Sequence, residues 1–463
     1  MNCVAVAVCS HGAPGLHDAS PLHPRHVASA ARTRLVEWIE RHMSRTPQRR
    51  AQQHTVFRRR WLRLLVVVAA AAAGGLALTW YAVHRFEWAG PLVANSLRAV
   101  LGAENVARLE DTAYGVEDGI NRVIRRGEKP RAYWRVEDAG LDVTQDEAAG
   151  EAAEQAELPP FRPKRVGPVH ASWSAPGDGE WIPIRDPRWP DVDPLMYKTL
   201  LHPDRNRSWA ELFVVALDLR RVAIKPRLGT REPAPNVDPE PVLDRPGTIP
   251  PSEHERTLAA FNGGFMTEHG KYGMMLDGVT IVKPHGRACT FAKYQDGPLR
   301  IASWSRVVDD LPEMEWFRQT PNCMVEAGNL HPVLASGTEK HWGATLDGDT
   351  VIRRSAIGLD ESGETLYVSI SNHTTAKAVA VGMQHVGAVA VAQLDVNWSY
   401  PKFVVFRAPA PGEPLQAEAL AEGFEFRRGE YLRDKSLRDF FYVTYRGPGV
   451  SSAEPSKLGS AEH

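Results

Sequence analysis

The sequence has few cysteines, and the four that it has are Cys3, Cys9, Cys289 and Cys323. No two of them form a Cys-x-x-Cys pair, and no cysteine stands at a His/Cys spacing typical of structural zinc. Neither charge is in surplus, since 55 lysines and arginines stand against 56 aspartates and glutamates. Composition therefore gives no reason to expect a structural metal or a nucleic-acid partner.

The sequence is not short of apolar runs, and one of them, residues 64–83 (LLVVVAAAAAGGLALTWYAV), contains no charge. About 20 apolar residues at ~1.5 Å rise span a bilayer core, so this run predicts a transmembrane helix. A cleaved signal peptide is the alternative, although its apolar region is shorter, about 7–15 residues. Arginines are concentrated before the run: Arg45, Arg49, Arg50, Arg58, Arg59, Arg60 and Arg63. By the positive-inside rule, residues 1–63 are a cytoplasmic basic segment and the later chain is periplasmic or extracellular.

The remaining segments differ in composition. Residues 87–135 carry an apolar stripe with helical spacing, which predicts a helical stalk or a helix packed on the following domain. Residues 136–160 are acidic and alanine-rich, which predicts a linker. The main domain is predicted at residues 161–450 and a disordered tail at 451–463. The stretch from Met43 is typical of the start of a signal-anchor protein, so Met43 is an alternative start.

Short runs of β-forming residues recur in the main domain, several of them separated by Asp-Gly or Ser-Gly turns. The predicted strands are residues 212–219, 222–225, 257–261, 274–282, 288–294, 299–304, 351–359, 365–371 and 388–395. A helix capped by Thr374 or Thr375 and ended by Gly387 joins the last two strands. The fold class is therefore α+β, with a mixed β-sheet and a crossover helix.

Polar residues gather where three of these strands end, in FNGGFMTEHGKYGMMLDG (residues 261–278), RRSAIG (353–358) and LDVNWSY (394–400). A strand that breaks into a glycine-rich loop is a common place for a binding site, because glycine lets the backbone approach a ligand. Asp395 ends an otherwise apolar run, so burial would force its carboxylate to find partners or to shift its pKa. Asp395 is thus a candidate acid, base or nucleophile.

The three motifs, in this order and over roughly residues 212–406, resemble the phosphodiester glycosidase family, which includes an enzyme that removes N-acetylglucosamine from a phosphodiester. The resemblance implies an active cleft in which Asn262, Arg354 and Asp395 are catalytic. Many members have LDGGGSS where this chain has LDVNWSY. The chain is more similar to a bacterial subgroup with an LD-x-N ending, in which Asn397 supplies polar contacts.

The remaining candidates are weaker. The substrate-binding candidates are Asn397, Gly263, Gly264, His269, Lys271 and Trp398, and the second-rank acids are Glu326 and Asp277. Several have a plain structural alternative: Asn262 as a turn cap, His269 as an ordinary loop residue, and Asp277 as part of a hairpin turn. Cys289 and Cys323 would lie outside the membrane, where they could form a disulfide or remain buried thiols.

The sequence thus predicts a membrane-anchored, outward-facing hydrolase, a glycosidase that acts on sugar 1-phosphodiesters in envelope glycans or phosphoglycans. No cofactor is predicted, and the sequence does not decide whether a divalent cation accompanies the phosphate. The alternative is a non-catalytic glycan-binding or envelope-organising protein on the same fold. In that case Trp398 and Tyr400 of the altered loop would stack on a sugar or fill the pocket.

Overall fold

The computed structural model describes most of the chain, which divides into two units, Met1–Ala82 and Val83–His463. The described residues are 47–85, 103–134, 158–336, 351–396, 400–410 and 412–447, with Glu37, Val93, Ser96 and Trp342. Several predictions lie outside these residues: Met43 as an alternative start, nearly all of the acidic linker, the tail at 451–463, and the roles of Asn397 and Trp398.

The long helix α2 (Pro47–Arg85) forms most of the described part of the first unit and ends three residues beyond it. Its segment Arg60–Thr79 is long and apolar enough to cross a membrane, and none of that segment is buried against protein. The length and composition expected of a membrane span are confirmed, while the direction in which the helix crosses stays a prediction.

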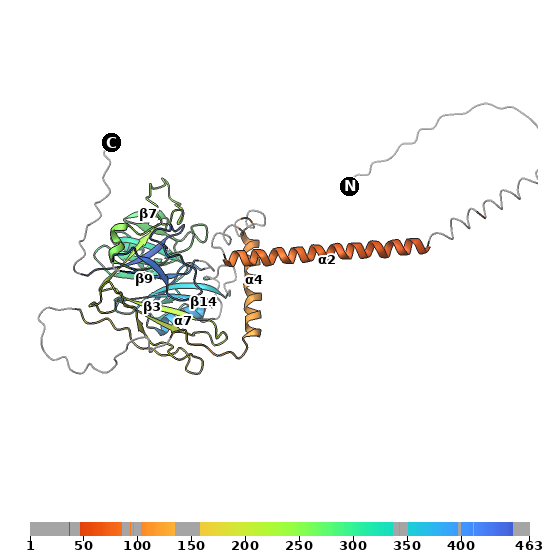
Figure 1. Ribbon diagram of the computed structural model, residues 1–463. Coiled ribbons are helices and arrows are strands. Elements are labelled where there is room, and N and C mark those ends of the chain that lie inside the picture. The colour runs from red at the N-terminus through yellow and green to blue at the C-terminus, as the bar shows by residue number, and fades with distance from the viewer. Residues whose placement is uncertain are drawn as a thin grey trace, which may run out of the picture. The chain divides into compact units, whose positions relative to one another are not determined.

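The second unit is built on three sheets (Figure 1). The first sheet has the order β1 (Ile182–Pro183), β2 (Met196–Leu201), β3 (Leu212–Asp218), β14 (Thr365–Thr374), β13 (Ile352–Leu359), β15 (Ala390–Gln393), β11 (Val325–Glu326), β12 (Asn329–Leu330). The second has the order β7 (Val279–Val282), β6 (Met274–Leu276), β10 (Met314–Thr320), β8 (Cys289–Tyr294), β9 (Leu299–Ser303). The third has the order β17 (Gln416–Ala419), β16 (Phe403–Arg407), β5 (Thr257–Asn262), β18 (Phe440–Tyr445), β4 (Val222–Arg227).

The helices of this unit are few and mostly short. Those whose bounds lie within the described residues are α4 (Ala103–Ile124), α5 (Trp304–Val307), α6 (Pro332–Ala335), α7 (Ala376–His385) and the 3₁₀ helices η2 (Pro251–Arg256) and η3 (Val308–Glu313). The predicted α+β class with a crossover helix is confirmed: β14 and β15 flank β13, and α7 connects them. The prediction of a mixed sheet is wrong, because all strand pairings within the three sheets are antiparallel over the described residues.

The cap of α7 is the predicted one. Thr375 Oγ1 accepts a hydrogen bond from the Ala378 backbone nitrogen at 3.1 Å, which satisfies a donor that the first turn leaves free. Gly387 follows the helix with φ of 106°, a left-handed conformation that favours glycine. One side of α7, including Val379 and Met383, packs into the apolar core on the first sheet.

Helix α4 packs on the domain, which is the second of the two alternatives for this segment, and a separate helical stalk is not shown. Both carboxylate oxygens of Asp118 accept hydrogen bonds from Arg207, each at 2.7 Å. Tyr114 packs against an apolar cluster that contains Phe265 and Val396. These contacts fix α4 to the second unit.

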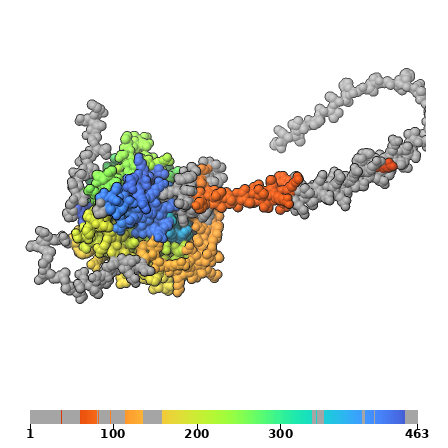
Figure 2. Space-filling model, viewed as in Figure 1, coloured from red at the N-terminus to blue at the C-terminus, as the bar shows by residue number. Residues whose placement is uncertain are grey.

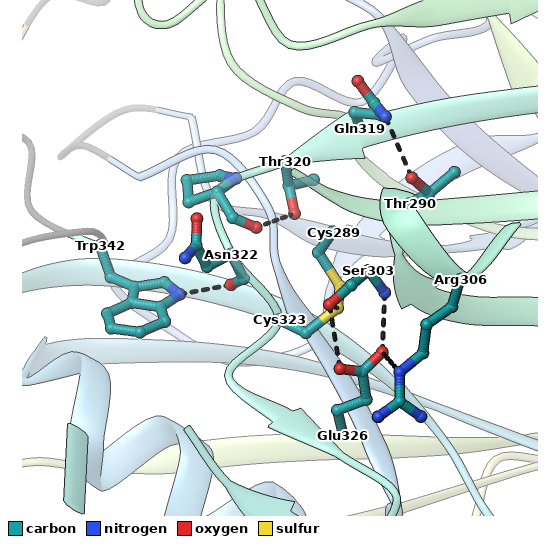
Figure 3. Close-up of a disulfide and its surroundings, with 11 residues drawn as sticks. Cys289, Thr290, Ser303, Arg306, Gln319, Thr320, Asn322, Cys323, Glu326 and Trp342 are labelled. Atoms are coloured by element: carbon teal, nitrogen blue, oxygen red, sulfur yellow. Dashed lines mark hydrogen bonds and ion pairs between the residues drawn. A yellow bond between two sulfur atoms is a disulfide. The ribbon is translucent and has the colours of Figure 1, made fainter. Parts of the chain in front are cut away.

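Cys289 and Cys323 form a disulfide, which connects β8 to the segment before β11 (Figure 3). Glu326 lies beside it, and its carboxylate accepts hydrogen bonds from the backbone nitrogen and the hydroxyl of Ser303 at 2.8 and 2.9 Å (Figure 3). Ser303 immediately precedes α5, so Glu326, a second-rank acid in the sequence, holds the start of a short helix in place.

Candidate active site

Two of the three predicted catalytic residues meet in one cleft of about 370 Å³. Asn262 and the two following glycines come from the end of β5, and Asp395 comes from the chain after β15. The other lining residues are Tyr400, Lys402, Arg427, Glu430, Tyr431, Asp434, Lys435, Ser436, Leu437, Arg438 and Asp439. The cleft thus combines residues from three distant parts of the sequence.

Asn262 joins these segments by hydrogen bonds. Its side-chain oxygen accepts from the Lys402 backbone nitrogen at 3.1 Å, and its side-chain nitrogen donates to Ser355 Oγ at 2.9 Å. Ser355 Oγ in turn donates to the backbone oxygen of Asp395 at 2.8 Å. Asn262 therefore positions Asp395, and its role is more specific than that of a turn cap.

The NGGF motif needs its two glycines because the side chains of Asp439 and Arg318 lie too close for a β-carbon at either position. A β-carbon on Gly263 would lie 2.3 Å from Asp439 Oδ2, and one on Gly264 would lie 2.7 Å from Arg318 Cζ. Asp439 Oδ2 also accepts a hydrogen bond from the Gly264 backbone nitrogen at 3.1 Å. The carboxylate of Asp439 can reach the loop because neither glycine has a side chain.

Gly264→Ala should therefore destabilise the domain by about 1–3 kcal/mol, as is typical of overpacking, because the Arg318 side chain that it meets is held by Asp439. The midpoint of urea unfolding measures this. Gly286→Ala is the matched control, since a β-carbon there meets nothing within 4 Å. Equal stability of the two variants would contradict the proposed crowding.

Asp395 is nearly inaccessible, with 3% of its surface exposed. One carboxylate oxygen accepts from the Val396 backbone nitrogen at 2.9 Å, and the other pairs with Arg438 Nη1. The Arg438 guanidinium in turn lies over the Tyr400 ring, 3.3 Å from its centroid. Burial raises the pKa of Asp395 to about 6, and Arg438 opposes this shift without cancelling it. The carboxyl group therefore changes protonation near neutral pH, as suits an acid or base catalyst.

This pKa predicts a pH-dependent difference between the wild type and Asp395→Asn. A carboxyl group whose pKa is higher in the folded state stabilises the fold at low pH, and this contribution is lost as pH rises through the folded-state pKa. The rise from 3.8 to about 6 corresponds to about 3 kcal/mol. We expect similar unfolding free energies near pH 4, and a variant more stable by about 3 kcal/mol above pH 6. Denaturant titrations across this range test it, and a constant difference would contradict it.

The third predicted catalytic residue, Arg354, lies elsewhere. Its guanidinium is fully buried and donates to the backbone oxygens of Thr374 and Trp342 and to Gln393 Oε1. It is not among the described residues that line the cleft. These contacts hold Arg354 inside the first sheet, and the guanidinium that lies beside Asp395 is that of Arg438.

Gly263 and Gly264 line the cleft as predicted, whereas His269, Lys271, Asp277 and Glu326 are outside its described lining. His269 and Lys271 lie in an exposed loop, where His269 Nε2 is 3.4 Å from Glu268 Oε1. Asp277 and Gly278, with φ of 50° and 77°, form the two-residue turn between β6 and β7, which is the hairpin alternative. Glu326 lies beside the disulfide. No cluster of three potential metal ligands occurs among the described residues.

Sequence reasoning missed the cations and the second carboxylate of the site. Arg438 and Asp439 immediately precede β18, a run of aromatic and β-branched residues. Asp439 pairs with Arg318 of β10, Nε to Oδ2 at 2.9 Å, and their side chains are 2% and 1% exposed. Lys402 pairs with Glu430 at 3.0 Å on the cleft wall. Asp395 was found because a charged residue stands at the end of an apolar strand. Arg438 and Asp439 stand at the start of one, so the same reasoning could have found them.

Comparison with known proteins gives little beyond the fold. No protein-family model and no curated protein sequence matches the chain. Among solved structures, the zebrafish N-acetylglucosamine-1-phosphodiester alpha-N-acetylglucosaminidase catalytic domain, auto-inhibited by its pro-peptide, is similar at 15% identity, with 55% of this chain and 85% of that chain covered and a TM-score of 0.36. A hypothetical protein from Synechocystis has 10% identity, coverages of 55% and 64%, and a TM-score of 0.33. A putative exported protein from Burkholderia pseudomallei has 11% identity, coverages of 51% and 74%, and a TM-score of 0.28. These values indicate a distant fold relationship at most.

Proposed function

We propose that this chain is a membrane-anchored hydrolase that cleaves sugar 1-phosphodiesters in envelope glycans or phosphoglycans. The observation that carries the proposal is Asp395, a buried carboxyl group with a pKa raised to about 6, paired with Arg438 on the wall of a cleft whose described lining holds four cations and four acids. The resemblance of the NGGF, RSAIG and LD motifs to phosphodiester glycosidases points to the same chemistry.

The reaction needs a group that accepts a proton and cations that hold the phosphate. Water attacks the anomeric carbon, Asp395 takes a proton from that water, and the electron pair of the broken carbon–oxygen bond leaves with the phosphate. A charge-neutralised phosphate is a good leaving group, so a strong general acid is not essential. The planar guanidinium of Arg438 suits a phosphate, and Lys435 adds charge at the exposed rim.

Two features support an outward-facing domain, in the periplasm or outside the cell. Arginines are concentrated before the apolar span, which favours a cytoplasmic N-terminus. The Cys289–Cys323 disulfide is of the kind that persists in oxidising compartments. Protease added to intact cells or spheroplasts should remove the domain, and protection of the domain would reverse the proposed orientation.

The test of the activity is release of free sugar by the full-length protein in detergent. The substrates are methyl esters of sugar 1-phosphates, with both anomers of several sugars. Turnover that requires Asp395 supports the proposal. Binding without turnover on any substrate would favour the non-catalytic alternative.

A further inference from the structure

A second hollow, of about 570 Å³, lies between α4 and the domain. Figure 2 shows α4, in orange, against the rest of the second unit. The lining of the hollow includes Glu117 and Asn121 of α4 and, from the domain, Glu211, Asn372 and Arg353. Glu211 directly precedes β3, Asn372 lies near the end of β14, and Arg353 lies near the start of β13. The hollow therefore lies at one end of the first sheet.

Asp395 lies at the same end of this sheet, because β3, β14, β13 and β15 are neighbours in that order. The Asn372 backbone nitrogen donates to the Glu211 backbone oxygen at 3.3 Å, and Arg353 Nε donates to Asn372 Oδ1 at 3.2 Å. Ser355, about 7 Å beyond Arg353 along β13, donates to the backbone oxygen of Asp395 at 2.8 Å. The hollow and the cleft are thus adjacent along one edge of the first sheet.

Two hydrogen-bond donors on the wall of this hollow have no partner among the described residues. They are Ser208 Oγ and Trp209 Nε1, both of which are buried, and Ser208 is 6% exposed as a whole. An indole nitrogen can only donate, so Trp209 requires an acceptor. A buried donor without an acceptor costs free energy, and native proteins have few of them. Two side by side indicate that a ligand supplies the acceptors.

The charges around these donors indicate that the acceptors belong to an anion. The described lining of the hollow holds four cations and three acids. A neighbouring hollow of about 590 Å³ shares Ser208 and Trp209 with it, and the described lining there holds four arginines and one acid. Burial raises the pKa of Glu211, so this acid carries its negative charge less readily than an exposed one. Glu128, which lines both hollows, is already paired with Arg131 at 2.9 Å.

Arg353 is the most deeply placed of these cations, with 2% of its surface exposed. Burial lowers the pKa of its guanidinium to about 10, and Glu425 opposes this shift without cancelling it. A further anion in the hollow would stabilise the charged form. A phosphate suits the place, since it offers several acceptor oxygens to guanidinium, indole and hydroxyl donors together.

We propose that the hollow is a subsite for a second phosphate of the glycan chain whose phosphodiester is cleaved at Asp395. The preferred substrate is then a chain with repeating phosphates, and a single sugar phosphate is a poor one. The identity of this chain rests on the proposed function, whereas phosphate binding at Ser208 and Trp209 is tested without turnover.

The binding test uses the full-length protein in detergent, with 5-fluorotryptophan in place of its 13 tryptophans. The fluorine signal that is missing from Trp209→Phe belongs to Trp209. Inorganic phosphate, added at constant ionic strength, should shift this signal and saturate the shift. Ser208→Ala should weaken the apparent affinity by about 10-fold or more, because it removes a hydrogen bond to a charged group.

Thr199→Val is the matched control. Thr199 Oγ1 is also buried without a partner among the described residues, but Thr199 lies in β2, outside the described lining of both hollows. This variant should leave the phosphate affinity unchanged. Neither variant should lower the midpoint of urea unfolding, because each removes a buried donor that the fold does not satisfy. Absence of a saturable shift at Trp209, or equal affinities in the two variants, would overturn the proposed subsite.

The turnover test takes a sugar whose 1-phosphate methyl ester is cleaved and compares it with a chain of three such units joined by phosphodiesters. KM should be about 10-fold or more lower for the chain, and Ser208→Ala should remove most of that advantage. Equal KM values for the two substrates would refute the chain as the preferred substrate. If no methyl ester is cleaved, the hydrolase proposal fails, and the fluorine shift at Trp209 still decides whether the hollow binds phosphate.

Discussion

Asp395→Asn should lower kcat for a sugar 1-phosphodiester by about 100- to 10,000-fold, with little change in KM. Asparagine keeps the shape of the side chain and can still contact Arg438 and the Val396 nitrogen, but it cannot take a proton from water. Because the pKa of Asp395 is raised to about 6, the wild-type rate should also rise with pH through that value as the carboxyl group ionises. Initial rates of sugar release from pH 4 to 8 measure both effects.

The matched control is Asp277→Asn, the same chemical change at an acid that lies in a hairpin turn. Asparagine tolerates a positive φ, so this variant should keep the full rate. Full activity in Asp395→Asn would reject the assigned base. A loss at Asp277 of similar size would show that the reaction takes place elsewhere.

Asp439→Ala should lower the free energy of unfolding by about 3–5 kcal/mol, since it leaves the Arg318 guanidinium buried without its counter-charge. The loss is large because water cannot replace the carboxylate at a site where both side chains are almost wholly buried. Denaturant unfolding of the full-length protein in detergent, followed by tryptophan emission, measures it.

Two comparisons make this second prediction specific. Glu418→Ala breaks the more exposed pair with Arg407, at 3.1 Å, and should cost no more than about 1 kcal/mol. Replacing both buried partners, Arg318→Met with Asp439→Leu, should recover part of the loss, because no charge is then left unpaired. Similar losses at the buried and exposed pairs would contradict the argument.

The sequence predicted those parts of the fold that depend on local pattern. β3, β13 and α7 were recognisable because apolar periodicity and a threonine cap are properties of neighbouring residues. β10 was missed because MEWFRQT contains four polar or charged residues, yet six of its seven residues are buried, all but Glu315. Arg318 is buried there only because Asp439, far along the chain, supplies its partner, and no local window contains both.

In the candidate site, too, residues marked by local pattern were predicted and residues placed by distant contacts were not. Asp395 and Asn262 were found because each ends a recognisable apolar strand. Arg354, within β13, was predicted as the site's cation, and Arg438, shortly before β18, was missed. The two arginines are distinguished only by the register of the sheets. It places the Arg354 guanidinium among backbone oxygens and the Arg438 guanidinium against Asp395.

The place of β18 affects how the protein must be made. β18 is the last strand among the described residues, yet it lies inside the third sheet between β5 and β4, whose residues precede it by about two hundred positions. The nascent chain therefore carries an incomplete sheet and an unpaired Arg318 until its final strand has left the ribosome. Because Arg438 and Asp439 come immediately before that strand, a premature stop anywhere upstream removes the assembled cleft as well as the last strand.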